Sequence, residues 1–515
     1  PEVELPESHI TPFVFRYAEE LADKPALIDG PTGRTLTYGQ LYGATLKAAG
    51  GLAARGFGKG DVLAIMAPNI PEYAIAFHAV AALGGVVTTI NPTYTAEEVE
   101  FQLNDAGARY LLTITMFMDV ATEAAGAAGT EEVFVFAEAE GATPFASLLD
   151  ADPIAGFAEV DPREDTVVLP YSSGTTGLPK GVMLTHHNLT SNLAQAKHVL
   201  DITDDEVIIA VLPFFHIYGM QILMNGVLYN GATAVTMPRF DLEQFLGLLQ
   251  EHKVTKAYLV PPIILALAKH PLVDQYDLSA LRQIFSGAAP LGADVEAEAG
   301  ARVGAEVVQG YGLTETSPVT HATPPGKGRS GSIGVTISNT DVRIIDPETG
   351  EDLGVGENGE VLIKGPQVMK GYLNNPDATA ECIDDEGWFH TGDVGYVDDD
   401  GYFYIVDRIK ELIKYKGFQV PPAELEALLL THAAVADAAV IPVPDLEAGE
   451  IPKAFVVLRP GAEATGQQLM DHVAEHVAHY KQVRRVEFLD EIPKSLSGKI
   501  LRRVLRDRER EATGT

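Results

Sequence analysis

Short apolar runs alternate with amphipathic segments through the first 330 residues of this chain. The run VVTTI at 86–90 predicts a buried strand, and Thr95 with Glu98 forms a capping box that opens the amphipathic segment after it. Gly107 ends that segment before the next apolar run, RYLLT at 109–113. The same order recurs further along the chain. Strands that alternate with helices of this length predict parallel βαβ sheets covered on both faces.

The pattern changes after about Gly328. Short strands separated by Gly-, Asp- and Pro-rich turns then predict an antiparallel barrel or meander, at 341–353, 359–365 and 401–407. Helical segments return after Asp407. This last unit has about one hundred residues, which is an ordinary domain size.

A length of 515 residues exceeds the roughly 250–300 that one hydrophobic core organises, so several domains are needed. We expect an α/β fold class: a large N-terminal domain of two parallel βαβ-type sheets plus a β-barrel subdomain, followed by a small mobile α+β C-terminal domain. The predicted boundaries are 1–407 and 408–515, with a hinge near 408–410.

Charge and cysteine content exclude several classes of function. The formal net charge of −35 opposes binding to nucleic acid or to an anionic membrane, because both need a basic surface. The one cysteine, Cys382, allows no disulfide or thiolate metal cluster within a chain, and no nucleophile signature surrounds it. The longest apolar run, at 257–268, is too short to span a bilayer. We expect a cytoplasmic protein with no membrane span and no obligate protein partner.

The stretch YSSGTTGLPKGV, residues 171–182, concentrates hydroxyl donors and glycines before Lys180. A Walker A loop needs G-x-x-x-x-G-K-[ST], but Pro179 and Gly181 stand where a glycine and a hydroxyl residue would be required. The composition still suits a phosphate, because glycines let backbone and hydroxyl donors approach an anion closely. The loop residues are Ser172, Ser173, Gly174, Thr175, Thr176 and Gly177.

This loop resembles the phosphate-loop signature of the adenylate-forming superfamily, which contains acyl-CoA synthetases, firefly luciferases and nonribosomal peptide adenylation domains. Four further stretches resemble the family's other motifs in the family's order, so the resemblance runs from about Thr35 to Arg503. These stretches are QGYGLTETSP (309–318), GWFHTGD (387–393), VDRIKELIKYKGFQVPPAELE (406–426) and IPKSLSGKILR (492–502).

The resemblance implies an ATP site in the large domain. Tyr311 would stack on adenine, Asp393 and Arg408 would bind the ribose, Thr314 would bind a phosphate oxygen, and Glu315 would hold Mg²⁺. A divalent ion suits such a site because adjacent phosphates carry charge that must be neutralised. The implied nucleotide set is Ser172, Ser173, Gly174, Thr175, Thr176, Gly177, Lys180, Ala289, Pro290, Gln309, Gly310, Tyr311, Thr314, Asp393, Arg408 and Lys499.

The resemblance also implies two reactions at one site. A carboxylate would attack the α-phosphate of ATP beside Lys499, and CoA would then accept the acyl group. Between these steps the small domain would rotate about the hinge Lys410 and bring in the segment 414–419. The implied catalytic residues are Lys499, Lys414, Gln419 and His216, the last as a gate, and the implied CoA positions are Lys416 and Gly417.

Two stretches should line the pocket for the acid, PFFHIYGMQILM at 213–224 and IFSGAAPLG at 284–292. The sequences of these stretches are similar to those of 4-coumarate:CoA ligases, which implies a hydroxycinnamate or cinnamate substrate. Ile222 and Phe285 depart from the plant pattern and make the pocket more apolar, which favours cinnamate. The implied wall residues are Tyr218, Ala288, Gly310, Gly312, Pro318 and Val319, and small residues among them leave a flat slot for a ring.

Several alternatives remain open at this point. A medium- or long-chain fatty acyl-CoA synthetase would use the same two steps. Luciferase-type oxidation and transfer to a carrier protein are further variants of the chemistry, and a nucleotide-binding regulator without catalysis is a different class. Taken singly, Glu315 and Asp393 are ordinary solvated carboxylates, and Lys499 is an exposed lysine in a basic C-terminal region, so the motifs carry the prediction.

Overall fold

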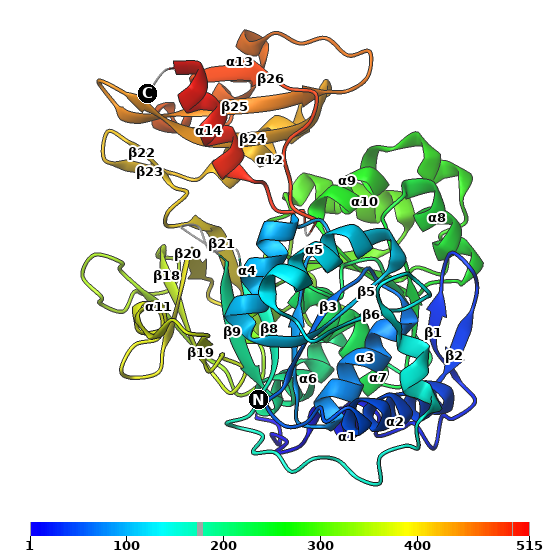
Figure 1. Cartoon of the computed structure of the whole chain (residues 1–515). Helices are drawn as coiled ribbons and strands as arrows, with labels where there is room; N and C mark the ends of the chain where they lie inside the picture. The colour runs from blue at the N-terminus through cyan, green and yellow to red at the C-terminus, as the bar shows by residue number, and fades with distance from the viewer. Residues whose placement is uncertain (1, 173–178, 497, 514–515) are drawn as a thin grey trace.

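The computed structural model describes residues 2–172, 179–496 and 498–513. Its large domain is built on two mixed sheets (Figure 1). The first sheet has nine strands, in the order β16 (Val335–Thr336), β15 (Val319–Ala322), β14 (Glu306–Gly312), β13 (Gln283–Ser286), β12 (Lys256–Leu259), β10 (Val207–Ala210), β11 (Thr233–Thr236), β1 (Pro25–Asp29) and β2 (Thr35–Thr37).

The second sheet has eight strands, in the order β19 (Gly371–Tyr372), β9 (Lys180–Thr185), β8 (Thr166–Ser172), β4 (Val86–Thr89), β3 (Val62–Met66), β5 (Ala108–Thr113), β6 (Glu132–Val135) and β7 (Thr143–Pro144). Both sheets are parallel in their centres, as predicted. Both also carry antiparallel strands, because β14 pairs antiparallel with β15 and β8 with β9. The motif at 309–318 lies on the β14–β15 connection, and the motif at 171–182 includes the end of β8 and the start of β9.

Helices α3 (Pro71–Ala82) and α6 (His186–Leu200) lie between the two sheets. Helix α3 contacts β1 of one sheet and β4 of the other, and α6 contacts β9 and β15. Every residue of α3 except Glu72 is buried, which explains its largely apolar sequence. The predicted capping box is present on α4 (Ala96–Ala106), where Thr95 and Glu98 bond each other's backbone, and Gly107 ends the helix with φ of 63°.

The third sheet is an antiparallel meander of β17 (Asp341–Ile345), β18 (Gly359–Lys364), β20 (Phe389–Val397) and β21 (Phe403–Arg408). The strands pair only in that order among the described residues, so the sheet stays open where a barrel would join β17 to β21. A single bridge from Gly334 to Phe403 connects it to the end of the nine-stranded sheet.

The C-terminal domain lies above the large domain in Figure 1. Its sheet contains β22 (Ile413–Tyr415), β23 (Phe418–Val420), β24 (Val435–Asp445), β25 (Gly449–Leu458) and β26 (Arg485–Phe488), with helices α12 (Pro422–Thr431), α13 (Gly466–Ala474) and α14 (Arg502–Thr513).

The apolar side chains at the start of α14 are not all buried. Leu505 is buried and Ile500 packs beside it, but Leu501 and Val504 are 40% and 50% exposed. Arg502 is half-buried between them and forms an ion pair with Glu426 at 2.7 Å.

In the described part of the chain, no helix combines the length and the apolar character needed to cross a bilayer.

Five histidines of the described large domain, His187 among them, are buried, and burial lowers the pKa of each. The pKa falls to about 4 for His9 and to about 3 for His78, His186 and His321. Below its ordinary pKa of about 6.5, an unfolded histidine takes up a proton that the folded one refuses. The contribution of each histidine to the stability of the large domain is therefore fully present above that pKa. Below it, the free energy of unfolding falls by about 1.4 kcal/mol per pH unit for each histidine.

We predict that the urea midpoint of the large domain drops steeply between about pH 7 and pH 5. The substitution His78→Gln should reduce the slope of the unfolding free energy against pH by the contribution of one proton, whatever it does to stability at neutral pH. A pH dependence that is unchanged by His78→Gln would contradict this account of the buried histidines.

Candidate active site

The adenine side of the candidate site is formed by the end of β14. Gly310 lies against the ring of Phe285 on β13: a Cβ on Gly310 would come within 2.4 Å of that ring and 3.0 Å of the His321 carbonyl oxygen. No other residue fits there without moving the ring. Tyr311 follows, half-buried, opposite His321 on β15, with the two ring centroids 5.9 Å apart. The strand pair therefore holds Tyr311 as a wall of the site.

Gln309 ties this wall to the loop that carries Ala289 and Pro290. Its side-chain amide accepts from the Leu291 N–H at 3.2 Å and donates to the Leu291 carbonyl at 3.1 Å. The same amide donates to Glu296 at 2.7 Å. The side chain of Gln309 thus holds the backbone of this loop. Its amide group is already engaged by these protein partners.

The ribose end is marked by Asp393 on β20, which is buried. Its carboxylate accepts a hydrogen bond from the Tyr311 hydroxyl and lies 3.3 Å from Nε of Arg408. Burial raises the pKa of Asp393, and the positive charge of Arg408 opposes that rise. The structure therefore brings Tyr311, Asp393 and Arg408 together, as the motifs predict.

The phosphate end is formed by β9 and the turn η5 (Thr314–Thr316). Lys180 begins β9 and pairs with Ser172 across the strand pair, and both are half-buried. Glu315 in the turn is buried and accepts a hydrogen bond from Tyr372 at 2.8 Å. Residues Ser173, Gly174, Thr175, Thr176 and Gly177 lie outside the described residues.

Lys499 reaches the large domain from a short hairpin of the C-terminal domain. The backbone of Lys494 pairs with Ile500, and the Ser495 N–H donates to the Lys499 carbonyl at 2.8 Å. At its tip Gly498, with φ of 77°, lies against the large domain: a Cβ there would stand 3.2 Å from atoms of Val260 and Pro262. A larger residue at the tip would push the hairpin outward.

The Lys499 side chain lies in a charged environment. Its surroundings lower its pKa, first by desolvation and then by the charge of Arg408, while Glu315 and Asp393 act in the opposite direction. The side chain is nevertheless accessible to solvent. A polyanion bound beside Arg408, Glu315 and Asp393 would therefore be contacted by Lys499.

The acid end is formed by the segment that leads into the π-helix η3 (Gly219–Gly226). Burial, and then the charge of Lys499, lower the pKa of His216 to about 3, so its imidazole is neutral at pH 7. Tyr218 is buried, and its hydroxyl donates to the Phe285 carbonyl at 3.3 Å. Ala288 has φ of 71°, a left-handed conformation that is uncommon for alanine and is typical of functional sites.

The wall residues Gly312, Pro318 and Val319 lie near Gly310 on the β14–β15 connection. A Cβ on Gly312 would stand 1.9 Å from the Pro318 carbonyl oxygen, so this turn closes only with glycine. The predicted acid residues therefore come from the ends of the neighbouring strands β13, β14 and β15 and, for Tyr218, from the segment before η3.

The predicted residues for the second reaction are not brought together with these groups. Lys414, Lys416, Gly417 and Gln419 lie on the β22–β23 hairpin, and all four are exposed. Lys416 and Gly417 form its tight turn, with φ of 48° and 86°. Lys410, the predicted hinge, is exposed in the turn that connects β21 to this hairpin. In this domain arrangement Lys499 faces the large domain and the hairpin faces solvent.

Sequence reasoning missed Tyr372 and the packing role of Gly498. Both stand in short Gly-containing stretches, KGY and SGK, where the glycine was the available signal. Cys382 was predicted to be inert, and its neighbourhood agrees: burial and the charge of Glu315 raise the pKa of its thiol to about 11.

Among the described residues, no group of three or more His, Cys, Asp or Glu side chains is arranged to hold a metal ion. Glu315 by itself is an oxygen ligand of the kind that Mg²⁺ accepts, since Mg²⁺ is held by one or two carboxylates together with substrate phosphates and water. The hydrogen bond from Tyr372 uses only one carboxylate oxygen, Oε1. The donor set therefore fits an ion shared with phosphate oxygens.

Comparison with known proteins agrees with this geometry. The model of the AMP-binding enzyme family matches residues 14–373, and that of the AMP-binding enzyme C-terminal domain matches residues 424–499. The chain is 45% identical over 519 residues to 4-coumarate--CoA ligase 3 of Oryza sativa subsp. japonica, covering 99% of this chain and 94% of the relative. It is 45% identical over 510 residues to 4-coumarate--CoA ligase of Pinus taeda, covering 96% and 94%.

Among solved structures, the chain is similar to the anthranilate CoA ligase AuaEII in complex with anthranoyl-AMP. The TM-score is 0.93 at 29% sequence identity, with 99% of both chains covered. A benzoate CoA ligase from Burkholderia xenovorans LB400 superposes with a TM-score of 0.88 at 27% identity, covering 97% of this chain and all of that chain. Matched by both domain models and by relatives over nearly its full length, the chain belongs to the adenylate-forming AMP-binding enzyme family.

Proposed function

We propose that this protein is an ATP-dependent acid:CoA ligase for cinnamate-type acids. It would activate the carboxylate as an acyl-AMP with release of pyrophosphate and then transfer the acyl group to CoA. The proposal rests on the position of Lys499. This residue of the small domain interacts electrostatically with four groups of the site, His216, Glu315, Asp393 and Arg408. This set of groups suits a reaction between two anions.

In the first step an oxygen of the substrate carboxylate attacks the α-phosphorus, and the bond to the β-phosphate oxygen breaks. Lys499 offsets the repulsion between the two anions and stabilises the charge that develops at the phosphorus. Lys180 would hold the leaving pyrophosphate, and Asp393 with Arg408 would fix the ribose. Glu315 would hold Mg²⁺, which neutralises phosphate charge when bound.

In the second step the sulfur of CoA attacks the acyl carbon, and AMP leaves with the bonding electrons. We propose that the small domain first turns about Lys410, because Lys414, Lys416, Gly417 and Gln419 lie on an exposed hairpin while Lys499 occupies the site. Neutral His216 accepts from the Tyr218 N–H at 3.3 Å and is affected by the charge of Lys499, so it would serve as the gate. One site then performs two reactions in turn.

Relatives named 4-coumarate--CoA ligase support the class of acid, and the pocket supports a preference within it. The Tyr218 hydroxyl is engaged by the Phe285 carbonyl, and Ile222 and Phe285 add apolar surface. A ring hydroxyl entering this pocket would lose water, and the Tyr218 hydroxyl could only accept from it, because its own hydrogen is donated to Phe285. We therefore propose cinnamate over 4-coumarate. The alternative substrate class, fatty acids, gains no specific support from this pocket, because aromatic rings form part of its wall.

The proposed function is tested by acid-dependent pyrophosphate release with Mg-ATP and CoA, comparing cinnamate, 4-coumarate, benzoate, octanoate and palmitate. We expect the two phenylpropenoic acids to give the highest kcat/KM, with cinnamate first, and the acyl-CoA to form in equal amount. Faster turnover of octanoate or palmitate would refute the aromatic assignment. ATP binding without pyrophosphate release for any acid would refute the ligase assignment.

We predict that Lys499→Ala lowers the rate of adenylation by about 10²–10³-fold, the scale of one preorganised charge contact. Supplied cinnamoyl-AMP should still be converted to cinnamoyl-CoA at close to the wild-type rate, because the second step uses the other arrangement of the domains. Equal losses in both half-reactions would show that Lys499 is needed for folding or domain packing instead.

We predict that Gly498→Val also impairs adenylation, by about tenfold or more, because its side chain would meet Val260 and Pro262 and displace the hairpin. The matched control is Gly461→Val, a surface glycine that also has positive φ but no neighbouring atoms within 4 Å of a Cβ. If the two variants lose adenylation equally, the effect comes from backbone strain and the proposed contact is wrong.

We predict that Phe285→Ala widens the acid pocket and raises the kcat/KM of ring-substituted acids relative to cinnamate by about tenfold, within the range for apolar pocket changes. Steady-state kinetics with ferulate and cinnamate measures this ratio. A thermal melt accompanies it, because removal of a buried ring costs about 3–5 kcal/mol of stability. An unchanged ratio in a folded variant would remove Phe285 from the pocket wall.

A further inference from the structure

The segment 366–373 joins the two halves of the phosphate end. The Met369 N–H donates to the Glu315 carbonyl at 2.8 Å, which ties the segment to the turn η5. The Leu373 N–H donates to the Gly181 carbonyl at 2.8 Å, which ties it to β9 next to Lys180. Between these bonds, β19 pairs with β9. The backbone of this segment therefore sets the spacing between Lys180 and Glu315.

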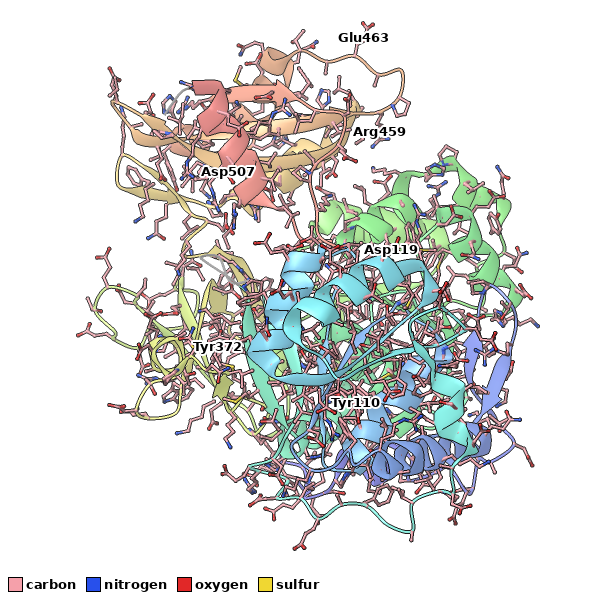
Figure 2. All side chains as sticks on the ribbon, in the orientation of Figure 1. Tyr110, Asp119, Tyr372, Arg459, Glu463 and Asp507 are labelled. Carbon is pink, nitrogen blue, oxygen red and sulfur yellow. The ribbon has the colours of Figure 1, made fainter. Side chains whose placement is uncertain are left out.

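The side chain of Tyr372 makes the same connection. Its hydroxyl donates to Oε1 of Glu315 at 2.8 Å, and Nζ of Lys180 lies 4.7 Å from the centroid of its ring. Figure 2 shows Tyr372 where the yellow subdomain meets the strands of the large domain. Its side chain is half-buried, and its backbone N–H donates to the Thr379 hydroxyl oxygen at 2.9 Å.

This arrangement keeps two opposite charges apart. Lys180 and Glu315 contact the same tyrosine, yet they do not form an ion pair with each other in the described structure. A direct ion pair would neutralise both groups before any nucleotide arrived. The face of the ring attracts the ammonium group, and the hydroxyl engages one carboxylate oxygen and orients the other. Lys180 stays available for phosphate oxygens and Glu315 for a divalent ion.

We propose that Tyr372 is a positioning residue for the pyrophosphate end: it holds Lys180 on its ring and orients Glu315 through its hydroxyl. This inference rests on the proposed function in assigning Mg²⁺ to Glu315 and phosphate to Lys180. The two contacts can be separated experimentally, because phenylalanine retains the ring and lacks the hydroxyl.

The test measures the dissociation constant of ATP by calorimetry, with and without Mg²⁺, so that no catalysis is involved. Tyr372→Phe should leave Mg²⁺-free binding within about twofold of wild type and should reduce the tightening by Mg²⁺ about tenfold, as for a hydrogen bond to a charged group. Tyr372→Leu should weaken Mg²⁺-free binding as well, because Lys180 loses its ring and is free to pair with Glu315.

A double-mutant cycle identifies the route of the effect. In a Glu315→Gln background, Tyr372→Phe should change the Mg²⁺ dependence by less than about twofold, because the hydroxyl acts through the carboxylate. Tyr404→Phe is the matched control: it removes a hydroxyl that bonds the Asp398 carboxylate at 3.3 Å, on β21, and should leave both constants unchanged.

Three results would overturn the inference. Tyr372→Phe could retain the full tightening by Mg²⁺, its effect could persist in the Glu315→Gln background, or Tyr404→Phe could match it. In these cases the wild type still shows Mg²⁺-dependent binding, so the proposed function stands and the role of Tyr372 alone fails. A wild type whose ATP affinity ignores Mg²⁺ would instead refute the assignment of Glu315, and the inference with it.

Discussion

The contact between the Lys499 hairpin and the large domain is the constraint on which the rest of the site depends. Nucleotide and acid groups lie on the large domain, but the cation that would join their reacting atoms comes from the small one. Gly498 lets the hairpin tip approach Val260 and Pro262 closely, and any Cβ there meets them at 3.2 Å. A site shared by two domains therefore depends on the fit of this hairpin tip.

Positive side chains at the site offset the repulsion of anionic substrates by the net negative charge of the chain. A chain with a net charge of −35 repels ATP and carboxylic acids at long range. The site concentrates Lys180, Arg408 and Lys499 around two carboxylates, Glu315 and Asp393, each of which has a separate partner. Tyr311 and Arg408 engage Asp393, and Tyr372 engages Glu315. The carboxylates are thus held in place without neutralising the lysines that the phosphates require.

Local signals in the sequence predicted many of the elements, and the motif residues Tyr311, Asp393 and Arg408 lie together in the structure. The capping box of Thr95 and Glu98 and the turn at Gly107 depend on neighbouring residues, so the helix between them could be delimited from sequence. The antiparallel edge strands, the choice of an open meander over a barrel, and the Tyr372–Glu315 hydrogen bond could not be derived in this way. That bond joins residues 57 positions apart, and nothing in KGY indicates which turn its tyrosine meets. Similarly, Leu501 and Val504 follow a helical apolar pattern, yet both are exposed, and Arg502 between them forms an ion pair.

The central claim is that a carboxylate oxygen attacks the α-phosphorus of ATP at this site. The most direct measurement uses cinnamate labelled with ¹⁸O in both carboxylate oxygens and mass spectrometry of the products after complete conversion to cinnamoyl-CoA. The account predicts one labelled oxygen in AMP, one in the thioester carbonyl and none in pyrophosphate, because the attacking oxygen stays on phosphorus when CoA displaces AMP. Label in pyrophosphate or inorganic phosphate, or unlabelled AMP, would contradict it.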